Sequence, residues 1–250
     1  MIAASVIAAL QLPADARVYL RVPKKLLVEN CAPTAADKRH INDGIEELVW
    51  LAALKPATIG VPAFRDDVRE YLEIAVLSLT LRVGAKAPLL TELIHRAIPY
   101  PVFLVQSQPG GLALSLAHLR CSQGQAGQTV LDGSLITANV DAQAPTTCDF
   151  LASLGITSQP RTHLHALYQG WIERFEAHAA ALHTGKFTPA VDPAVAERRR
   201  AALAEHNRLN NEITSLRARA AKEKQINRRA ELNVQVKQLE SRLTEAAKHF

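Results

Sequence analysis

The sequence predicts an α+β fold: a mostly antiparallel sheet with flanking helices, followed by a C-terminal helical arm that forms a coiled-coil-like antiparallel hairpin. Three observations favour this fold. Over residues 1–147, apolar runs of strand length are interspersed with amphipathic stretches of helix length. From residue 148 onward, helical spacing dominates. After Pro193, no Gly or Pro occurs up to the last residue, which favours long uninterrupted helix.

The first elements follow from apolar spacing and from proline. Residues 2–10 carry an apolar residue at every fourth position, which predicts a short helix, and residues 18–22 read as a strand. Apolar residues of segment 37–54 follow helical spacing, and Pro56 is expected to end that helix. Residues 58–61 are a candidate strand.

The strongest predicted strand is Tyr71–Leu81, because its β-branched and leucine content is typical of a central strand that is buried on both faces. Pro109-Gly110-Gly111 predicts a hairpin turn. The other expected elements are a polar turn at 65–67, a helix at 89–97, strands at 102–105, 112–119 and 134–140, and a long helix at 162–181. This order of strands and helices is typical of a mostly antiparallel sheet.

We divide the chain into a sheet domain (1–147), a helical segment packed on it (148–185), a linker (186–196) and a basic helical arm (197–250). The arm carries two short heptad runs that start at Leu209 and Leu232 and are out of phase with each other. The phase break favours an antiparallel hairpin with Asn227 near the turn. A single helix with a local defect is the alternative.

Positive charge is concentrated in this arm. The chain has 29 Lys and Arg against 24 Asp and Glu, a net charge of +5, but residues 197–250 hold 13 against 7. The arm is therefore a solvated hairpin, a docking element for a protein partner, or a phosphate-binding element. The predicted contact residues are Lys222, Lys224, Asn227, Arg228 and Arg229.

Several classes of protein are excluded or disfavoured. The three cysteines show no CxxC spacing, which argues against a disulfide scaffold or a cysteine zinc site, and no apolar run is long enough for a membrane span. No phosphate-binding glycine loop occurs, so we expect no nucleotide cofactor. Because neither the cysteines nor the histidines have the spacing of metal ligands, we also expect no bound metal. The apolar N-terminus lacks the basic residues of a signal peptide before Arg17, so we expect a cytoplasmic protein.

One catalytic alternative stays open. Glu46, Asp66, Asp67 and Glu73 flank or enter the strongest strand, so a divergent metal-dependent nuclease with an acidic site there is the second candidate function. The lysine that a restriction-type site needs two residues after the acid is missing, because Glu73 is followed by Ile74 and Ala75. The histidines of segment 163–183 are not spaced to share a helix face, so we expect no metal site there.

Six segments of the chain together resemble a bacterial family known only as domain of unknown function 4391. They are Val22–Lys25, Ile45–Trp50, Leu54–Ile59, Glu73–Ile74, Ala97–Val102 and Lys222–Asn233, in the family's order. The last segment is the most specific, and the six span nearly the whole chain.

The resemblance implies an α+β body with a C-terminal hairpin, but no assigned reaction and no catalytic residues. It also implies a setting in restriction-modification or phage-defence loci, beside helicases and DNA methyltransferases. The leading expectation is therefore a non-catalytic accessory subunit of a DNA-directed complex. Its basic arm would dock to a helicase, a methyltransferase, DNA or a second copy of the chain.

Overall fold

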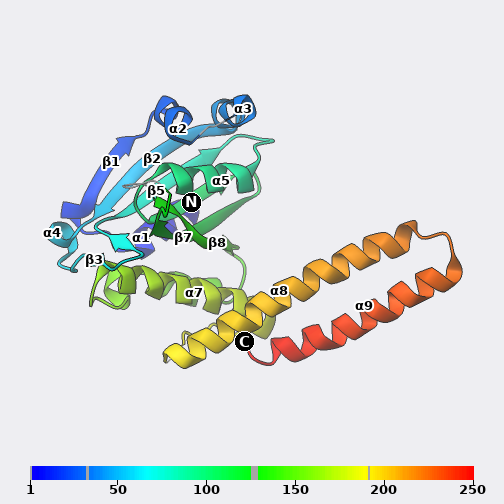
Figure 1. Cartoon of the computed structure of the whole chain (residues 1–250). Coiled ribbons are helices and arrows are strands. Elements are labelled where there is room, and N and C mark those ends of the chain that lie inside the picture. Colours follow the sequence, from blue (N-terminus) through cyan, green and yellow to red (C-terminus); the bar gives the residue numbers. More distant parts are fainter. Residues whose placement is uncertain (1, 32–33, 125–128, 191) are drawn as a thin grey trace. The chain divides into compact units, whose positions relative to one another are not determined.

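The structure, a computed structural model, describes residues 2–31, 34–124, 129–190 and 192–250 (Figure 1). It divides into two compact units, Met1–Phe175 and Glu176–Phe250, with the boundary inside helix α7 (Leu164–Thr184). The finer division at residues 147, 185 and 196 stays a prediction. No helix among the described residues is long and apolar enough to cross a membrane.

The first unit is built on a six-stranded sheet that confirms the predicted α+β fold. Its strands, in spatial order, are β1 (Arg17–Arg21), β2 (Ile45–Leu54), β5 (Ile74–Leu81), β6 (Val102–Gln108), β7 (Gly111–Cys121) and β8 (Thr129–Val140). All neighbours pair antiparallel except β5 and β6, which are parallel and are connected through helix α5 (Ala87–Ala97). A separate ribbon pairs β3 (Phe64–Arg65) with β4 (Glu70–Tyr71).

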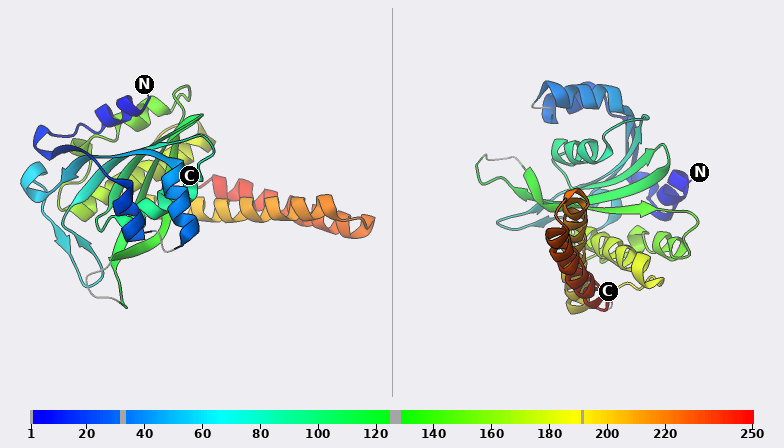
Figure 2. Two further views of the ribbon diagram at one scale, coloured as in Figure 1. Left: turned by 90° about the horizontal axis from the view of Figure 1, so that it is seen from above. Right: turned by 90° about the vertical axis from the view of Figure 1, so that its right-hand side faces the viewer.

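Helices cover both faces of this sheet, as the right-hand view of Figure 2 shows. One face carries α2 (Lys24–Cys31), α3 (Ala35–Gly44) and α5. The other carries α1 (Ile2–Ala9), α6 (Thr147–Ala152) and the first part of α7. Short helical turns lie at α4 (Pro56–Ile59), η1 (Ala14–Ala16) and η2 (Ile156–Ser158).

The alternation of strand side chains explains why both faces are covered. On β6, Val102 and Leu104 belong to the core under α5, whereas the ring of Phe103 points to the opposite face and lies 5.0 Å from that of Trp171 in α7. β5 lies between β2 and β6, and most of its residues are buried. The prediction of a central strand buried on both faces is therefore confirmed for residues 74–81, while Tyr71 belongs to β4.

The helix expected at 37–54 is wrong in its second half. Helix α3 ends at Gly44, and residues 45–54 form β2, which pairs with β1 and β5. The run IEELVWLAAL is apolar at so many positions that it fits the helical period and the strand period equally, and pairing between two strands decides the outcome. A side chain on Gly44 would lie 2.8 Å from Leu90, so the chain approaches α5 closely at this transition.

The strand expected at 58–61 is also wrong. Pro56 begins the short helix α4 instead of ending a preceding one, and its fixed φ suits the first helical position. The Thr58 hydroxyl accepts a hydrogen bond from the Lys55 amide at 2.9 Å. Gly60, with a φ of 65°, ends the turn in a left-handed conformation. Helix α2 was not predicted at all.

The second unit contains the end of α7, then α8 (Pro193–Lys222) and α9 (Ile226–Ala247). Helices α8 and α9 pack against each other as a hairpin whose turn is residues 223–225, visible in orange and red in Figure 2. Asn227 is the second residue of α9, next to the turn as predicted. The hairpin, and not the single helix, is therefore the form of the arm.

Candidate functional site

The two heptad runs of the arm bury each other. Leu209 and Ile213 of α8 are almost fully buried and pack in one cluster with Val236 and Leu239 of α9. These positions are the ones that the heptad spacing marks as seam residues. Since each seam covers the other, the hairpin leaves little of its apolar surface for a helical partner.

Ion pairs join the two helices in the stem of the hairpin, by which we mean α8 up to residue 218 and α9 from residue 230. Arg217 of α8 donates to Glu240 of α9 at 2.6 Å, and Arg242 of α9 donates to Glu205 of α8 at 3.0 Å. Within α8, Arg208 also pairs with Glu205 and Glu212. Exposed pairs of this kind contribute at most about 1 kcal/mol each, so their main effect is to neutralise the stem.

The five predicted contact residues lie together at the tip of the hairpin. Lys222 ends α8, Lys224 lies in the turn, and Asn227, Arg228 and Arg229 stand in the first turn of α9. All five are exposed, and Arg219, one turn before the end of α8, adds a further cation. We define these six residues as the hairpin tip. None of its five cations forms an ion pair with any residue that the structure describes.

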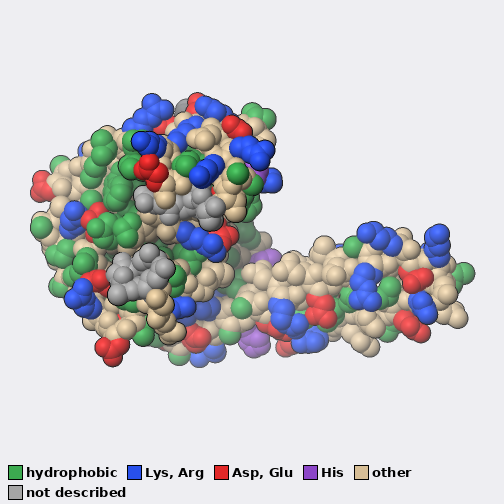
Figure 3. Space-filling model, turned by 45° about the horizontal axis from the view of Figure 1, so that its top comes forward, with side chains coloured by type: hydrophobic (Ala, Val, Ile, Leu, Met, Phe, Trp, Pro, Cys, Tyr) green, Lys and Arg blue, Asp and Glu red, His purple; other side chains and the backbone are tan. Residues whose placement is uncertain are grey.

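Helix geometry adds to the positive potential of the hairpin tip. The first turn of α9 has no acidic residue, and its N-cap, Gln225, makes no capping hydrogen bond through its side chain. The partial positive charge of a helix N-terminus therefore adds to Arg228 and Arg229. The nearby Glu223 carboxylate accepts from the Gln225 amide at 2.8 Å instead of pairing with a cation. Figure 3 shows Lys and Arg side chains in blue around this end of the arm.

Comparison with known proteins decides the family. The family model described as Domain of unknown function (DUF4391) matches residues 10–243. The chain belongs to the DUF4391 family. The match includes the sheet unit and the hairpin tip, which confirms the resemblance inferred from the six segments. No curated protein and no solved structure matches the chain.

In this DUF4391 protein, the four carboxylates of the nuclease alternative lie in different places: Glu46 and Glu73 lie at opposite ends of β2, and Asp66 and Asp67 lie in the turn between β3 and β4. Glu46 is exposed near the start of β2, whereas Glu73 precedes β5 beside the end of β2, since Leu54 pairs with Ile74. Eight residues of strand separate the two positions, roughly 26 Å. No three acidic, histidine or cysteine side chains among the described residues could share a metal ion. The nuclease stays an untested prediction.

The individual carboxylates have local roles. Glu73 is buried and pairs with Lys55 at 3.0 Å. Asp66 lies in the turn between β3 and β4, where it accepts from the backbone amides of Val68 and Arg69. These hydrogen bonds lower the pKa of the Asp66 carboxyl. Asp67 is exposed beside it.

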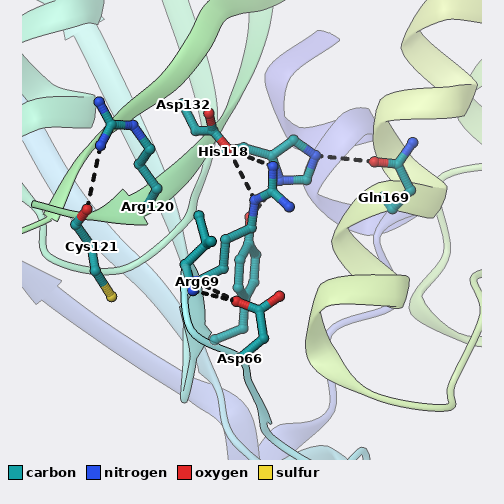
Figure 4. A network of polar contacts seen from close by, with 9 residues as sticks. Asp66, Arg69, His118, Arg120, Cys121, Asp132 and Gln169 are labelled. Carbon is teal, nitrogen blue, oxygen red and sulfur yellow. Dashed lines mark hydrogen bonds and ion pairs between the residues drawn. The ribbon is translucent and has the colours of Figure 1, made fainter. Parts of the chain in front are cut away.

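A polar network that the sequence did not predict lies behind that turn (Figure 4). The Tyr71 hydroxyl donates to Nδ1 of His118, and Nε2 of His118 donates to Oε1 of Gln169 at 3.0 Å. Arg69 pairs with Asp132 of β8 at 2.5 Å. Burial raises the pKa of the Tyr71 hydroxyl, which therefore stays protonated. The network links the β3–β4 ribbon, β7, β8 and α7.

The histidines of segment 163–183 were not expected to share a helix face, yet the rings of His163 and His165 lie 6.0 Å apart. His163 precedes α7, and its Nδ1 accepts from the Ala166 amide at 3.0 Å. Both imidazole rings pack against Phe64: the ring centre of His163 lies 4.6 Å and that of His165 4.9 Å from the ring centre of Phe64. Burial, and next the neighbouring His118, lowers the pKa of His165 to about 4. In the sequence, the high histidine content of segment 163–183 was the signal that could have pointed to this cluster of rings.

Proposed function

We propose that this protein is a non-catalytic accessory subunit that binds DNA phosphates through the hairpin tip. The observation that carries the proposal is the contrast within the hairpin. In the stem, Arg208, Arg217 and Arg242 pair with glutamates, although isolated cations such as Arg198 and Lys237 do not; the five cations of the tip are clustered, and none has an ionic partner in the described chain. Unpaired cations beside a helix N-terminus are suited to phosphate.

Three features of the hairpin favour phosphate over other ligands. The apolar seams face each other within the hairpin, so little apolar surface is left on which a partner helix could dock. At the tip the exposed large apolar side chain is Ile226, and a single such residue is common on protein surfaces. The tip residues include no aromatic ring, so stacking on bases is not supported.

The cellular setting is part of the same proposal. The resemblance implied restriction or phage-defence loci with helicases and DNA methyltransferases, and DNA binding by the arm suits an accessory subunit of such a cytoplasmic complex. The sheet unit, with its two helical layers, would then serve as the platform that a helicase, a methyltransferase or a second copy contacts.

Binding of a fluorescein-labelled duplex, followed by anisotropy, tests the proposal. The double variant Arg228→Glu with Arg229→Glu is expected to weaken binding by about tenfold or more, because two phosphate contacts become repulsive. The matched control, Arg198→Glu with Lys237→Glu, makes the same charge change at exposed positions outside the tip. Equal losses in both variants would mean that net charge alone drives binding and that the tip is not the site.

A further inference from the structure

A cavity of about 380 Å³ lies on the α5 face of the sheet, between the first residues of α5 and strands β6, β7 and β8. Its polar lining comes from six uncharged side chains: Thr91, Gln106, Gln108, Ser115, Thr137 and Asn139. The volume is in the range of small-molecule sites. We call it the amide pocket.

Strand register explains why the pocket exists. Ala113 of β7 pairs with Gln106 of β6 on one side and with Asn139 of β8 on the other. All three side chains point to the same face, so a methyl group stands between two carboxamides. Two strand spacings separate those carboxamide positions, roughly 10 Å. The small residue forms the floor of a slot whose walls carry amide groups.

The hydrogen bonds inside the pocket leave an amide group and a hydroxyl group able to bind a ligand. Gln106 is buried; its carbonyl oxygen accepts from the Thr91 hydroxyl, and its Nε2 donates to Oε1 of Gln108 at 3.4 Å. This orients the exposed Gln108, whose Nε2 has no partner among the residues that the structure describes. The Thr137 hydroxyl is exposed at the same face. A ligand would therefore meet a pre-positioned amide edge and a hydroxyl.

The pocket is also electrically neutral. None of the described residues that line it carries a charge. Behind Ser115 lies His95, whose Nε2 is 2.9 Å from the Ser115 hydroxyl. Burial lowers the pKa of His95 to about 3, so this imidazole is neutral at pH 7. An anionic or cationic group would find no counter-charge here, whereas a neutral polar ring would lose no ionic hydration.

We propose that the amide pocket binds a neutral nucleobase, with adenine preferred. A glutamine or asparagine side chain makes two hydrogen bonds to N6 and N7 of adenine, and Pro88 and Leu135 supply apolar wall against the flat ring. A second cavity of about 580 Å³ shares Gln108 and Asn139 with the first, which leaves room for the attached sugar. The base could belong to a free nucleoside or to a single strand.

Calorimetric titration tests this inference in the Arg228→Glu, Arg229→Glu background, so that phosphate binding at the hairpin tip does not contribute. The probes are adenosine, cytidine and single-stranded oligodeoxyadenylate. We expect saturable binding of adenosine or of the oligonucleotide, and the tighter of the two identifies the source of the base. Gln108→Leu, an exposed position that does not threaten the fold, should weaken binding about tenfold.

Ala113→Leu fills the floor of the slot and should abolish binding, with circular dichroism as the check that the variant is folded. The inference is overturned if neither adenine probe binds, if binding is unchanged in Gln108→Leu, or if cytidine binds as well as adenosine. Because the tip is already disabled in every sample, these outcomes are independent of the DNA-binding proposal.

Discussion

The guanidinium of Arg217 lies 2.6 Å from the carboxylate of Glu240, and this pair joins α8 to α9 close to the end of the neutralised stem. Beyond it toward the turn, Arg219, Lys222 and Lys224 have no ionic partner in the described chain. The Arg217–Glu240 pair therefore lies at the boundary between the stem, where ion pairs join the helices, and the hairpin tip, where the positive charge is not balanced.

The stability of the stem should depend on its buried leucines. Leu209→Ala removes a fully buried side chain from the seam cluster, and we expect the free energy of unfolding to fall by about 2–5 kcal/mol. Urea denaturation followed by circular dichroism measures this loss. Val234→Ala, at a position of α9 that is 55% exposed, is the control and should change the stability by less than about 0.5 kcal/mol.

The stability of the sheet unit should depend on the buried hydroxyl group of one tyrosine. The hydroxyl of Tyr168 donates to the Val102 carbonyl at 2.7 Å and accepts from the Ala117 amide at 2.9 Å. Tyr168→Phe leaves both backbone groups without this partner, so we expect a loss of about 1–3 kcal/mol in thermal or chemical denaturation. Tyr19→Phe, at an exposed tyrosine, should have no measurable effect. Equal stability of the two variants would contradict this role.

Acid should destabilise the protein through His95. Its folded pKa of about 3 lies below the usual 6.5, so under pH 6.5 the unfolded chain binds a proton that the folded chain does not. The stability present above pH 6.5 is therefore lost as the pH falls toward 3, by about 2 kcal/mol at pH 5. His95→Gln, which can still reach Ser115, should flatten this part of the stability profile. Parallel profiles for the two proteins would refute the assignment.

The parts of the fold that the sequence predicted are those with local signals. The Pro109-Gly110-Gly111 turn sits between β6 and β7, and Gly110 has a φ of 94° that glycine adopts easily. The hairpin tip was predictable because a phase break and a cluster of cations coincide in sequence. Segment 45–54 was mispredicted because strand pairing, which is not local, decides its conformation.

The missed sites depend on contacts between distant residues. Tyr71 and His118 are 47 positions apart and meet only when the β3–β4 ribbon folds over β7. The amide pocket requires Gln106, Ala113 and Asn139 to align across three strands, which their sequence positions do not reveal until the register is known. Periodicity identifies faces of single elements, and these sites are made of faces from several elements.

The measurement that tests the central claim most directly is the salt dependence of duplex binding by the full chain and by the Arg228→Glu, Arg229→Glu variant. If the two arginines contact phosphates, affinity of the wild-type chain falls steeply with salt, and the slope of log K against log salt is shallower by about 2 in the variant. A wild-type affinity that does not change with salt, or equal slopes for the two proteins, would contradict DNA binding by the hairpin tip.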